Sequence, residues 1–177
     1  MEKTISGICI ELVRGDIASQ PDIQAVVNAA NAGLRTGGGV AGAIHRAAGP
    51  GLEQECSPLA PISPGEAVIT GAHNLPNDYV IHCLGPVYGR DKPEARLLAD
   101  CYKNALRLAE DNRIESVAFP AISSGAFGYP LKEAAEVAVT AIFMVVPELQ
   151  HVKKIRFVLF SESDMDIFGT VLSSLEP

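Results

Sequence analysis

Short apolar segments recur along the whole chain, and their lengths and residue types are typical of buried or half-buried strands. In residues 7–13, Ile8, Ile10 and Leu12 alternate with other residues, so they fall on one side of an extended segment. Residues 25–29 form a short apolar run, as expected of a strand that is buried on both faces. The predicted strands are residues 7–13, 25–29, 66–71, 79–84, 116–119 and 155–160.

Segments with helical spacing of apolar residues separate these strands. The alanine-rich residues 40–48 predict a short helix, and three longer stripes predict further helices. Pro93 lies near the start of the first longer helix, Pro147 stops the second, and Asp164 is the predicted N-cap of the third. The three stripes are Leu97, Cys101, Ala105 and Leu108; Leu131, Ala134, Ala135, Ala138, Ile142 and Val145; and Ile167, Phe168, Val171, Leu172 and Leu175.

Strands that alternate with helices predict an α/β protein with a mainly parallel sheet, covered by helices on both faces. Ligands of such sheets bind at the carboxyl ends of the strands, in the loops that lead to helices. Residues 57–64, with the sequence SPLAPISP, are predicted to form a proline-rich surface loop.

Composition narrows the class of protein. With 177 residues, 47% of them apolar and 20% charged, the chain is expected to form one soluble globular domain over residues 1–177. No apolar run is long enough to cross a bilayer, and residues 1–15 lack the pattern of a signal peptide. Four scattered cysteines without metal-ligand spacing are expected to be reduced, mostly buried thiols of a cytoplasmic protein.

The net charge of −7, with no cluster of lysine or arginine, argues against nucleic acid as a partner. Backbone N–H groups would therefore have to do most of the work of holding a phosphate. His73, His82 and His151 have no carboxylate or histidine at metal-ligand spacing, so structural roles and no bound metal are expected. The acidic residues expected to lie on solvated helix faces are Asp100, Glu110, Asp111, Glu133 and Glu136.

Two segments at the ends of predicted strands carry candidate chemistry. The first joins Asn28 and Asn31 to three consecutive glycines, Gly37, Gly38 and Gly39, ahead of the first predicted helix. Such glycines let N–H groups converge at a helix N-terminus, which suits a diphosphate, and the amide of Asn31 suits a sugar diol. By themselves, however, the glycines favour a simple flexible turn that the asparagines cap.

The second segment is PAISSGAFGYP, residues 120–130, which directly follows one predicted strand and directly precedes a helix. Its serines and glycines make another loop rich in N–H groups. Phe127 is unusual in a surface turn unless it lies against a flat apolar group, and the alternative is a phenylalanine of the core. Ser123 and Ser124 do not form a GxSxG motif, so neither is favoured as a nucleophile. A twisted parallel sheet brings such loops side by side, so the two are predicted to hold one diphosphate together.

Five segments in this order resemble the macrodomain family, in particular its bacterial MacroD-type branch. They are Gly15-Asp16-Ile17, VVNAAN, GGGVAGAIHRAAG, FPAISSGAFGYP and the closing FVLF. The resemblance covers nearly the whole chain. It implies a three-layer α/β/α sandwich with a mixed, mainly parallel central sheet, which binds ADP-ribose in a cleft across the top of the sheet without a cofactor.

The resemblance also implies roles for single residues. Asp16 would accept a hydrogen bond from the adenine amino group beside the backbone of Ile17, and Phe160 would pack on the adenine ring. Asn31 would orient the distal ribose, against which Phe127 would lie. Taken without the other segments, Asp16 is better explained as the cap of a short turn and Phe160 as a core strand residue. The remaining ligand-binding residues expected from these loops are Asn28, Gly37, Gly38, Gly39, Val40, Ser123, Ser124, Gly125 and Ala126.

The chain departs from the MacroD-type pattern at two positions. Ala41 stands where those relatives carry an aspartate that is held to help activate water, and Thr36 stands where they commonly have a further glycine. His45 matches the histidine that partners this aspartate, so it is either a catalytic residue beside Asn31 and Phe127 or a packed structural one.

The resemblance implies a hydrolase that removes mono-ADP-ribose from acidic side chains, or acetate from O-acetyl-ADP-ribose, by substrate-assisted attack of water. Without the aspartate, hydrolysis is expected to be slow. A non-catalytic ADP-ribose reader and an ADP-ribose 1″-phosphatase are the alternatives. The expected partners are ADP-ribose or a mono-ADP-ribosylated protein.

Overall fold

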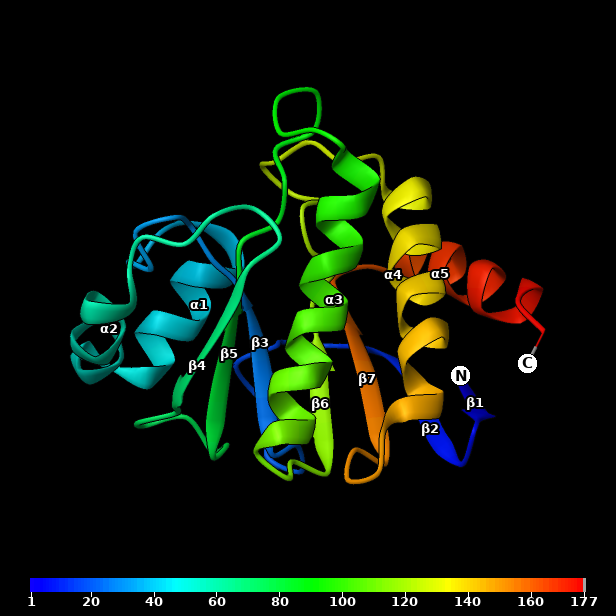
Figure 1. Ribbon diagram of the computed structural model, residues 1–177, viewed down its shortest axis with the longest axis horizontal. Helices are drawn as coiled ribbons and strands as arrows, with labels where there is room; N and C mark the ends of the chain where they lie inside the picture. Colours follow the sequence, from blue (N-terminus) through cyan, green and yellow to red (C-terminus); the bar gives the residue numbers. More distant parts are fainter. Residues whose placement is uncertain (177) are drawn as a thin grey trace.

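The computed structural model describes residues 1–176 and contains a seven-stranded sheet in the order β1-β2-β7-β6-β3-β5-β4 (Figure 1). The β1/β2 and β4/β5 pairs are antiparallel and the pairs between them are parallel, which confirms a mixed, mainly parallel sheet. The strands are β1 (Glu2–Ile5), β2 (Ile8–Arg14), β3 (Ala25–Ala29), β4 (Ala67–Gly71), β5 (Tyr79–Cys83), β6 (Ser116–Phe119) and β7 (Lys154–Leu159). The α-helices are α1 (Gly39–Ala48), α2 (Pro50–Cys56), α3 (Glu94–Asp111), α4 (Leu131–Val145) and α5 (Glu162–Ser174).

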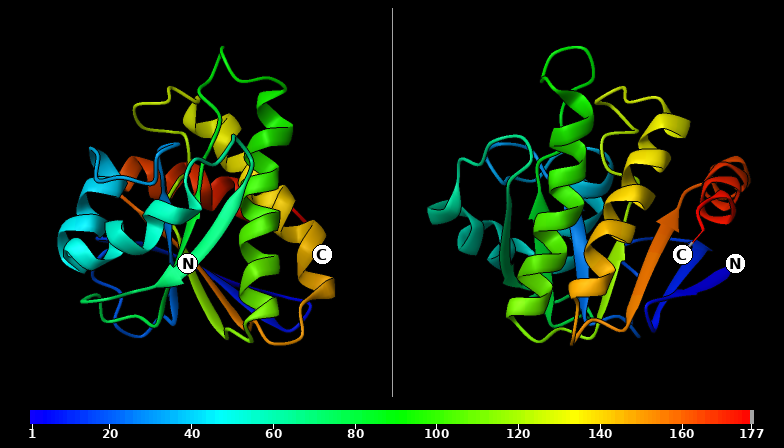
Figure 2. Two further views of the ribbon diagram at one scale, coloured as in Figure 1. Left: turned by 60° about the vertical axis from the view of Figure 1, so that its left-hand side comes forward. Right: turned by 45° about the vertical axis from the view of Figure 1, so that its right-hand side comes forward.

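Two hydrophobic cores, one on each face of the sheet, give the three layers. Helices α3, α4 and α5 pack on one face, and α1 and α2 pack on the other (Figures 1 and 2). Neighbouring buried residues of strand β3 show the division, because Val27 belongs to the first core and Val26 to the second. The predicted α/β/α sandwich is therefore confirmed.

Two elements were not predicted from the sequence. Strand β1 pairs with β2 through a hairpin whose two-residue turn is Ser6-Gly7, with φ of 51° and 77°. Both values are in the left-handed region, as a type I′ hairpin turn requires. Helix α2 starts at Pro50, which is accepted in the first turn because its missing N–H needs no partner there. A Ser-Gly pair before an alternating strand and a Gly-Pro pair after an alanine-rich helix were the available signals.

Three sequence-based expectations need correction. The N-cap of α5 is Ser161, whose Oγ accepts the backbone N–H of Asp164 at 3.2 Å, so Asp164 lies in the first turn. The segment 57–64 is not entirely a surface loop, because Ser57–Leu59 forms a 3₁₀ turn and Ile62 is only 6% exposed. Phe160 lies just beyond β7 and is 88% exposed, which excludes a role in the core.

Glu110 is not simply a solvated charge on a helix face. Its carboxylate accepts the backbone N–H groups of Gln150, His151 and Val152 at 2.6–3.2 Å and contacts the His151 ring at 2.9 Å. Burial acts to raise the pKa of Glu110, but these hydrogen bonds outweigh it and lower the pKa to about 2. The residue thus fastens the turn before β7 to the end of α3.

The cysteines agree with the sequence-based expectation that most of them are buried thiols. All four are free, and Cys56, Cys83 and Cys101 are buried while Cys9 is partly exposed. Within residues 1–176, no helix combines the length and apolar character needed to cross a membrane. The same residues contain no cluster of three potential metal ligands from His, Cys, Asp and Glu.

Candidate functional site

The carboxyl ends of the parallel strands meet at one edge of the sheet. The loops of residues 30–38, 85–93 and 120–130, which follow β3, β5 and β6, all lie at this edge (Figures 1 and 2). The Tyr88 N–H donates to the carbonyl oxygen of Phe127 at 2.9 Å, so the second and third loops are hydrogen-bonded to each other. Parallel strand pairing therefore brings together segments that are far apart in sequence.

A cavity of about 300 Å³ opens between these loops, a volume at the lower end of the range for small-molecule sites. It brings together the asparagine at the end of β3, the three glycines before α1 and the loop after β6. Its lining consists of Ala29, Ala30, Asn31, Gly37, Gly38, Gly39, Val40, Ala41, Gly85, Ala121, Ile122, Ser123, Gly125, Ala126 and Phe127. The lining contains no lysine or arginine, so a ligand's negative charge there would meet backbone dipoles instead of basic side chains.

The glycine loop before α1 and the loop after β6 both have free N–H groups at this cavity. Helix α1 begins at Gly39, and its N-cap, Gly38, provides no side-chain cap for the first N–H groups. In the loop after β6, the backbone N–H groups that donate hydrogen bonds to backbone carbonyl oxygens are those of Ser124, Gly128 and Tyr129. Among residues 1–176, none accepts a hydrogen bond from the N–H groups of residues 125–127. A helix N-terminus and a turn with unused N–H groups are the combination that suits an anion.

Gly85 and Ser123 fit against each other in the cavity wall. Ser123 has a φ of 66° and is only 6% exposed, and its Oγ has no hydrogen-bond partner among the described residues. A Cβ on Gly85 would overlap this Oγ, so only glycine fits there without a shift of the loop. Gly85 was missed from the sequence, although a Gly-Pro pair directly after the predicted strand 79–84 was a signal for a loop at the same edge.

Asn31 occupies the wall of the cavity at the end of β3. Its Nδ2 donates to the carbonyl oxygen of Arg35 at 2.7 Å, and its Oδ1 accepts the Arg35 N–H at 3.0 Å. The amide therefore closes the turn that leads into the glycines. It shares the lining of the cavity with Phe127, which is half-buried.

Asp16 and Phe160 lie at the neighbouring ends of β2 and β7. The Gly15 N–H donates to the Leu159 carbonyl oxygen at 3.1 Å, which joins the two strand ends. Asp16 is exposed, and its Oδ1 accepts the Ala18 N–H at 2.9 Å, so it does cap a short turn. Ile17 is buried in the core under α1, which leaves its backbone as the only part available to a ligand.

Besides Asp16, Ile17 and Phe160, three more predicted site residues do not line the cavity: Asn28, Ser124 and His45. Asn28 is fully buried on β3, where its Nδ2 donates to His82 Nδ1 at 3.1 Å. Ser124 uses its hydroxyl within its own turn, donating to the Ala121 carbonyl oxygen at 2.7 Å. Neither side chain is therefore placed to contact a ligand in the cavity. Asn28 instead supports the strand, and Ser124 supports its own turn.

Burial, reinforced by the nearby ring of His45, lowers the pKa of His82 to about 3, so this imidazole is neutral. Asn28 donates to Nδ1, which leaves Nε2–H to donate to Thr70 Oγ1 at 3.0 Å, and Thr70 in turn donates to the Gly71 carbonyl oxygen. The expectation of a structural role for His82 fits this chain of bonds.

His45 lies beneath the cavity in α1 and is 4% exposed. Burial lowers its pKa, and within residues 1–176 neither ring nitrogen has a hydrogen-bond partner. Ala41, one helical turn earlier, is in the cavity wall itself. Of this pair, only the small apolar side chain lines the cavity, and the unpaired imidazole does not.

Comparisons with known proteins agree with this architecture. The Macro domain family model matches residues 27–138. A protein of Klebsiella pneumoniae named O-acetyl-ADP-ribose deacetylase is 46% identical over 169 residues, covering 93% of this chain and 96% of its own length. A macro domain-containing protein of Chlorobaculum tepidum is 43% identical over 94% of this chain and 97% of its own length.

Solved structures show the same likeness. The Oceanobacillus iheyensis macrodomain with ADP superimposes with a TM-score of 0.93 at 39% identity, covering 98% of this chain and 94% of that one. The Trypanosoma brucei macrodomain in complex with ADP-ribose superimposes with a TM-score of 0.85 at 36% identity, covering 91% and 68%. With its sheet order, its cavity and these relatives taken together, the chain belongs to the Macro domain family.

Proposed function

We propose that this chain binds ADP-ribose along the carboxyl edge of its sheet and hydrolyses an ester at the distal ribose. The observation that carries the proposal is the order of strand ends across the sheet, β2-β7-β6-β3. In this order lie an exposed carboxylate with an exposed aromatic ring, then the loop after β6, then Asn31 with the glycines. Adenine, diphosphate and distal ribose follow one another in the same order along ADP-ribose.

Each part of the ligand meets suitable chemistry. Asp16 would accept from the adenine amino group while Phe160 covers the ring, beside the backbone of Ile17. The diphosphate would lie in the cavity between Gly37–Val40 and Ser123–Phe127, where N–H groups at the start of α1 and in the second loop supply the positive end of their dipoles. This fits a protein of net charge −7 whose cavity has no basic side chain.

The distal ribose would lie against Phe127 with its hydroxyls at Asn31. Water next to the diphosphate would lose its proton to a phosphate oxygen and split the ester into a ribose hydroxyl and a carboxylic acid. The acid would be the side chain of a modified aspartate or glutamate, or acetate. The protein's contribution would be positioning by Asn31 and Phe127 and electrostatic stabilisation by loop N–H groups. Without a protein base the rate should be lower by about 10²–10⁴.

A second function, non-catalytic recognition of ADP-ribose, is favoured by Ala41. This residue offers no carboxylate to the cavity, and His45 behind it does not line the cavity. The reader and the hydrolase share the same ligand and differ only in turnover.

The two functions are separated by following label loss from a protein that is mono-ADP-ribosylated on glutamate, and from O-acetyl-ADP-ribose. The hydrolase predicts loss above that of Asn31→Ala, with equal unfolding temperatures as the control that the variant is folded. No loss above this variant, together with calorimetric preference for ADP-ribose over ADP and AMP, would establish the reader. Phosphate release from ADP-ribose 1″-phosphate would instead support the phosphatase.

Gly42→Ala is expected to weaken ADP-ribose binding about tenfold, because about 1.4 kcal/mol of strain would fall on the phosphate loop. Gly42 is buried in α1, and a Cβ there would overlap the carbonyl oxygen of Gly37, a backbone atom with little freedom to move. Calorimetry measures the change. Gly169→Ala in α5, where the new methyl group meets only the Met1 sulfur, is the control. Unchanged affinity in Gly42→Ala would argue against Gly37 as part of the phosphate site.

A further inference from the structure

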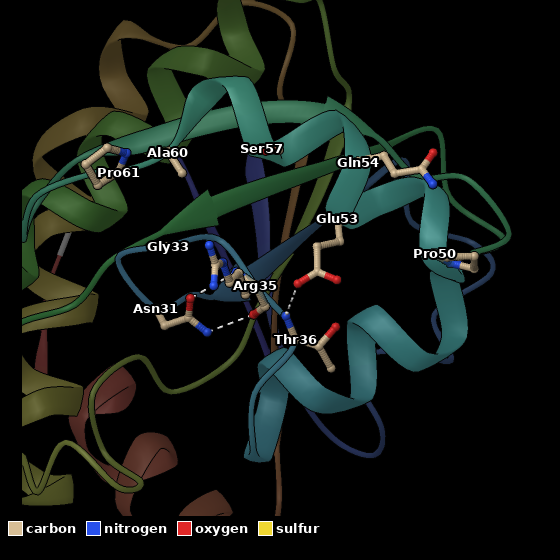
Figure 3. A pocket seen from close by; sticks show the side chains of 10 residues that line it. All are labelled: Asn31, Gly33, Arg35, Thr36, Pro50, Glu53, Gln54, Ser57, Ala60 and Pro61. Carbon is tan, nitrogen blue, oxygen red and sulfur yellow. Dashed lines mark hydrogen bonds between the residues drawn. The ribbon is translucent and has the colours of Figure 1, made fainter.

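Asn31 and Phe127, the two residues proposed for the distal ribose, are held in place by different parts of the chain. The amide of Asn31 closes its own turn through two hydrogen bonds with Arg35 (Figure 3). Phe127 lines two cavities, the one proposed for the diphosphate and a second of about 390 Å³. A ring that borders two cavities has fewer packing contacts to fix it, so the placement of Phe127 depends strongly on its backbone.

The backbone of Phe127 is anchored by the loop of residues 85–93. The Tyr88 N–H donates to the Phe127 carbonyl oxygen at 2.9 Å, and the Tyr88 ring meets the Tyr129 ring edge-on, with centroids 4.9 Å apart. Among the described residues, the other backbone hydrogen bonds made by residues 123–129 stay within their own loop. The bond from Tyr88 is therefore the one through which a distant segment sets the position of Phe127.

A short turn that ends at Asp91 fixes the backbone next to Tyr88. Asp91 Oδ2 accepts the Val87 N–H at 2.8 Å, and the Val87 carbonyl oxygen accepts the backbone N–H groups of Arg90 and Asp91 at 3.0 and 2.9 Å. Both polar groups of the Val87 backbone are thus tied to the end of the turn, and Tyr88 is the next residue.

The side chain of Asp91 works here as a carboxylate. The hydrogen bond from the Val87 N–H lowers the pKa of Asp91, so the group is ionised at neutral pH and accepts strongly. Arg90 contributes little to this arrangement, because its side chain is 73% exposed and its Nε lies 3.4 Å from Asp91 Oδ1. The bond to the Val87 N–H is therefore the main structural task of the carboxylate.

We propose that Asp91 is a positioning residue, which acts through Tyr88 on Phe127 and so determines how well the site recognises the distal ribose. Asp91 lines the second cavity but not the one proposed for the diphosphate, so it is placed to act through Phe127 and not on the ligand itself. Without the carboxylate, the Tyr88 N–H would no longer be held towards the Phe127 carbonyl oxygen. The inference rests on the proposed function, because it needs Phe127 to lie against the distal ribose, but it does not depend on turnover.

The test compares the Kd of ADP-ribose with the Kd of ADP, which lacks the distal ribose, by calorimetry. Asp91→Ala should raise the Kd of ADP-ribose about tenfold and leave the Kd of ADP within about twofold, whereas general damage to the site would weaken both. Asp91→Asn, whose amide oxygen can still accept the Val87 N–H, should restore most of the affinity for ADP-ribose. Loss of a negative charge alone would instead strengthen both ligands, and in both variants alike.

A double variant tests whether the effect passes through Phe127. Phe127→Ala should itself weaken ADP-ribose binding, and adding Asp91→Ala should then change the Kd by less than about twofold, because the ring that Asp91 positions is missing. Asp78→Ala is the matched control, since it removes an exposed carboxylate directly before β5, at the other end of the strand. It should leave both Kd values unchanged, and equal unfolding temperatures would show that all variants are folded.

A second measurement needs no ligand. In the free protein, the Tyr88 amide hydrogen should exchange with solvent about tenfold faster in Asp91→Ala than in wild-type protein. Unchanged exchange, unchanged affinity for ADP-ribose in Asp91→Ala, or additive losses in the double variant would each overturn Asp91 as a positioning residue and leave the proposed function standing. Absence of ADP-ribose binding in wild-type protein would overturn the proposed function itself, so the two failures are distinct.

Discussion

Arg156→Met is expected to lower the free energy of unfolding by about 3–5 kcal/mol, because it leaves a buried carboxylate without its main partner. Arg156 and Glu11 are 8% and 7% exposed, and Arg156 Nε donates to Glu11 Oε1 at 2.7 Å. The guanidinium also forms a two-pronged pair with Asp22 at 2.8 and 2.7 Å and donates to Gln20 Oε1 at 2.8 Å. After the substitution, Glu11 would keep only Lys154, at 3.8 Å.

Urea unfolding of the two proteins at neutral pH measures this difference. Arg14→Met is the matched control, since Arg14 pairs with Glu162 in the open, at 3.3 Å, where ion pairs contribute about 0–1 kcal/mol. The double substitution Arg156→Met with Glu11→Leu should recover most of the loss, because it removes the stranded charge. A loss below about 1 kcal/mol for Arg156→Met alone would mean that Glu11 finds water or another partner.

Because of the same ion pairs, the free energy of unfolding depends on pH. Hydrogen bonding to Arg156 lowers the pKa of Asp22 from 3.8 to about 2. A depressed folded-state pKa gives stability that is present above the unfolded value, so the contribution of Asp22 is lost as the pH falls from about 4 to 2. The stability gap between wild-type protein and Arg156→Met should narrow over this interval. Gln20 also donates to the Asp16 carbonyl oxygen at 2.9 Å, so the network supports the turn proposed to hold adenine.

The strongest sequence signals were those in which local pattern and tertiary burial agree. Strands β3 and β6 have the predicted bounds because each is a short apolar run between polar turns. The helix bounds also follow the predicted stripes, with Pro93 as N-cap of α3 and Pro147 just past the end of α4. Strand β1 was not predicted, because two of its four residues are charged and only Ile5 faces the core.

The sequence could not show which face of the sheet each side chain of β3 points to. In a strand buried on both faces, alternation of apolar and polar residues no longer tells which face a residue occupies. Asn28 was therefore assigned to the ligand with Asn31, whereas the sheet turns it towards His82 in the core. The seven-residue helix α2 was not predicted from the sequence either. Contacts between distant segments decide both features.

Ala41→Asp is expected to raise the rate of ester hydrolysis about 10²-fold, at the lower end of the effect of a placed general base. Ala41 lines the cavity, so a carboxylate there would reach the space proposed for the attacking water. It would also lie one helical turn from His45, whose ring nitrogens have no partner among the described residues. The resemblance to MacroD-type relatives implies the same pairing of aspartate with histidine.

Ala41→Asn separates the base from the added volume, because it has the same shape but cannot take a proton. Single-turnover rates on the glutamate-linked substrate should rise in Ala41→Asp and not in Ala41→Asn. ADP-ribose affinity needs measurement in parallel, since a carboxylate near the diphosphate repels it and an affinity loss would mask the gain at low substrate. Burial now lowers the pKa of His45, and a carboxylate beside it would raise that pKa, so the pH–rate profile should also change. Equal rates at saturating substrate in wild-type protein, Ala41→Asp and Ala41→Asn would show that the phosphate oxygens of the substrate already supply the base. Ala41 would then not lower the rate of hydrolysis.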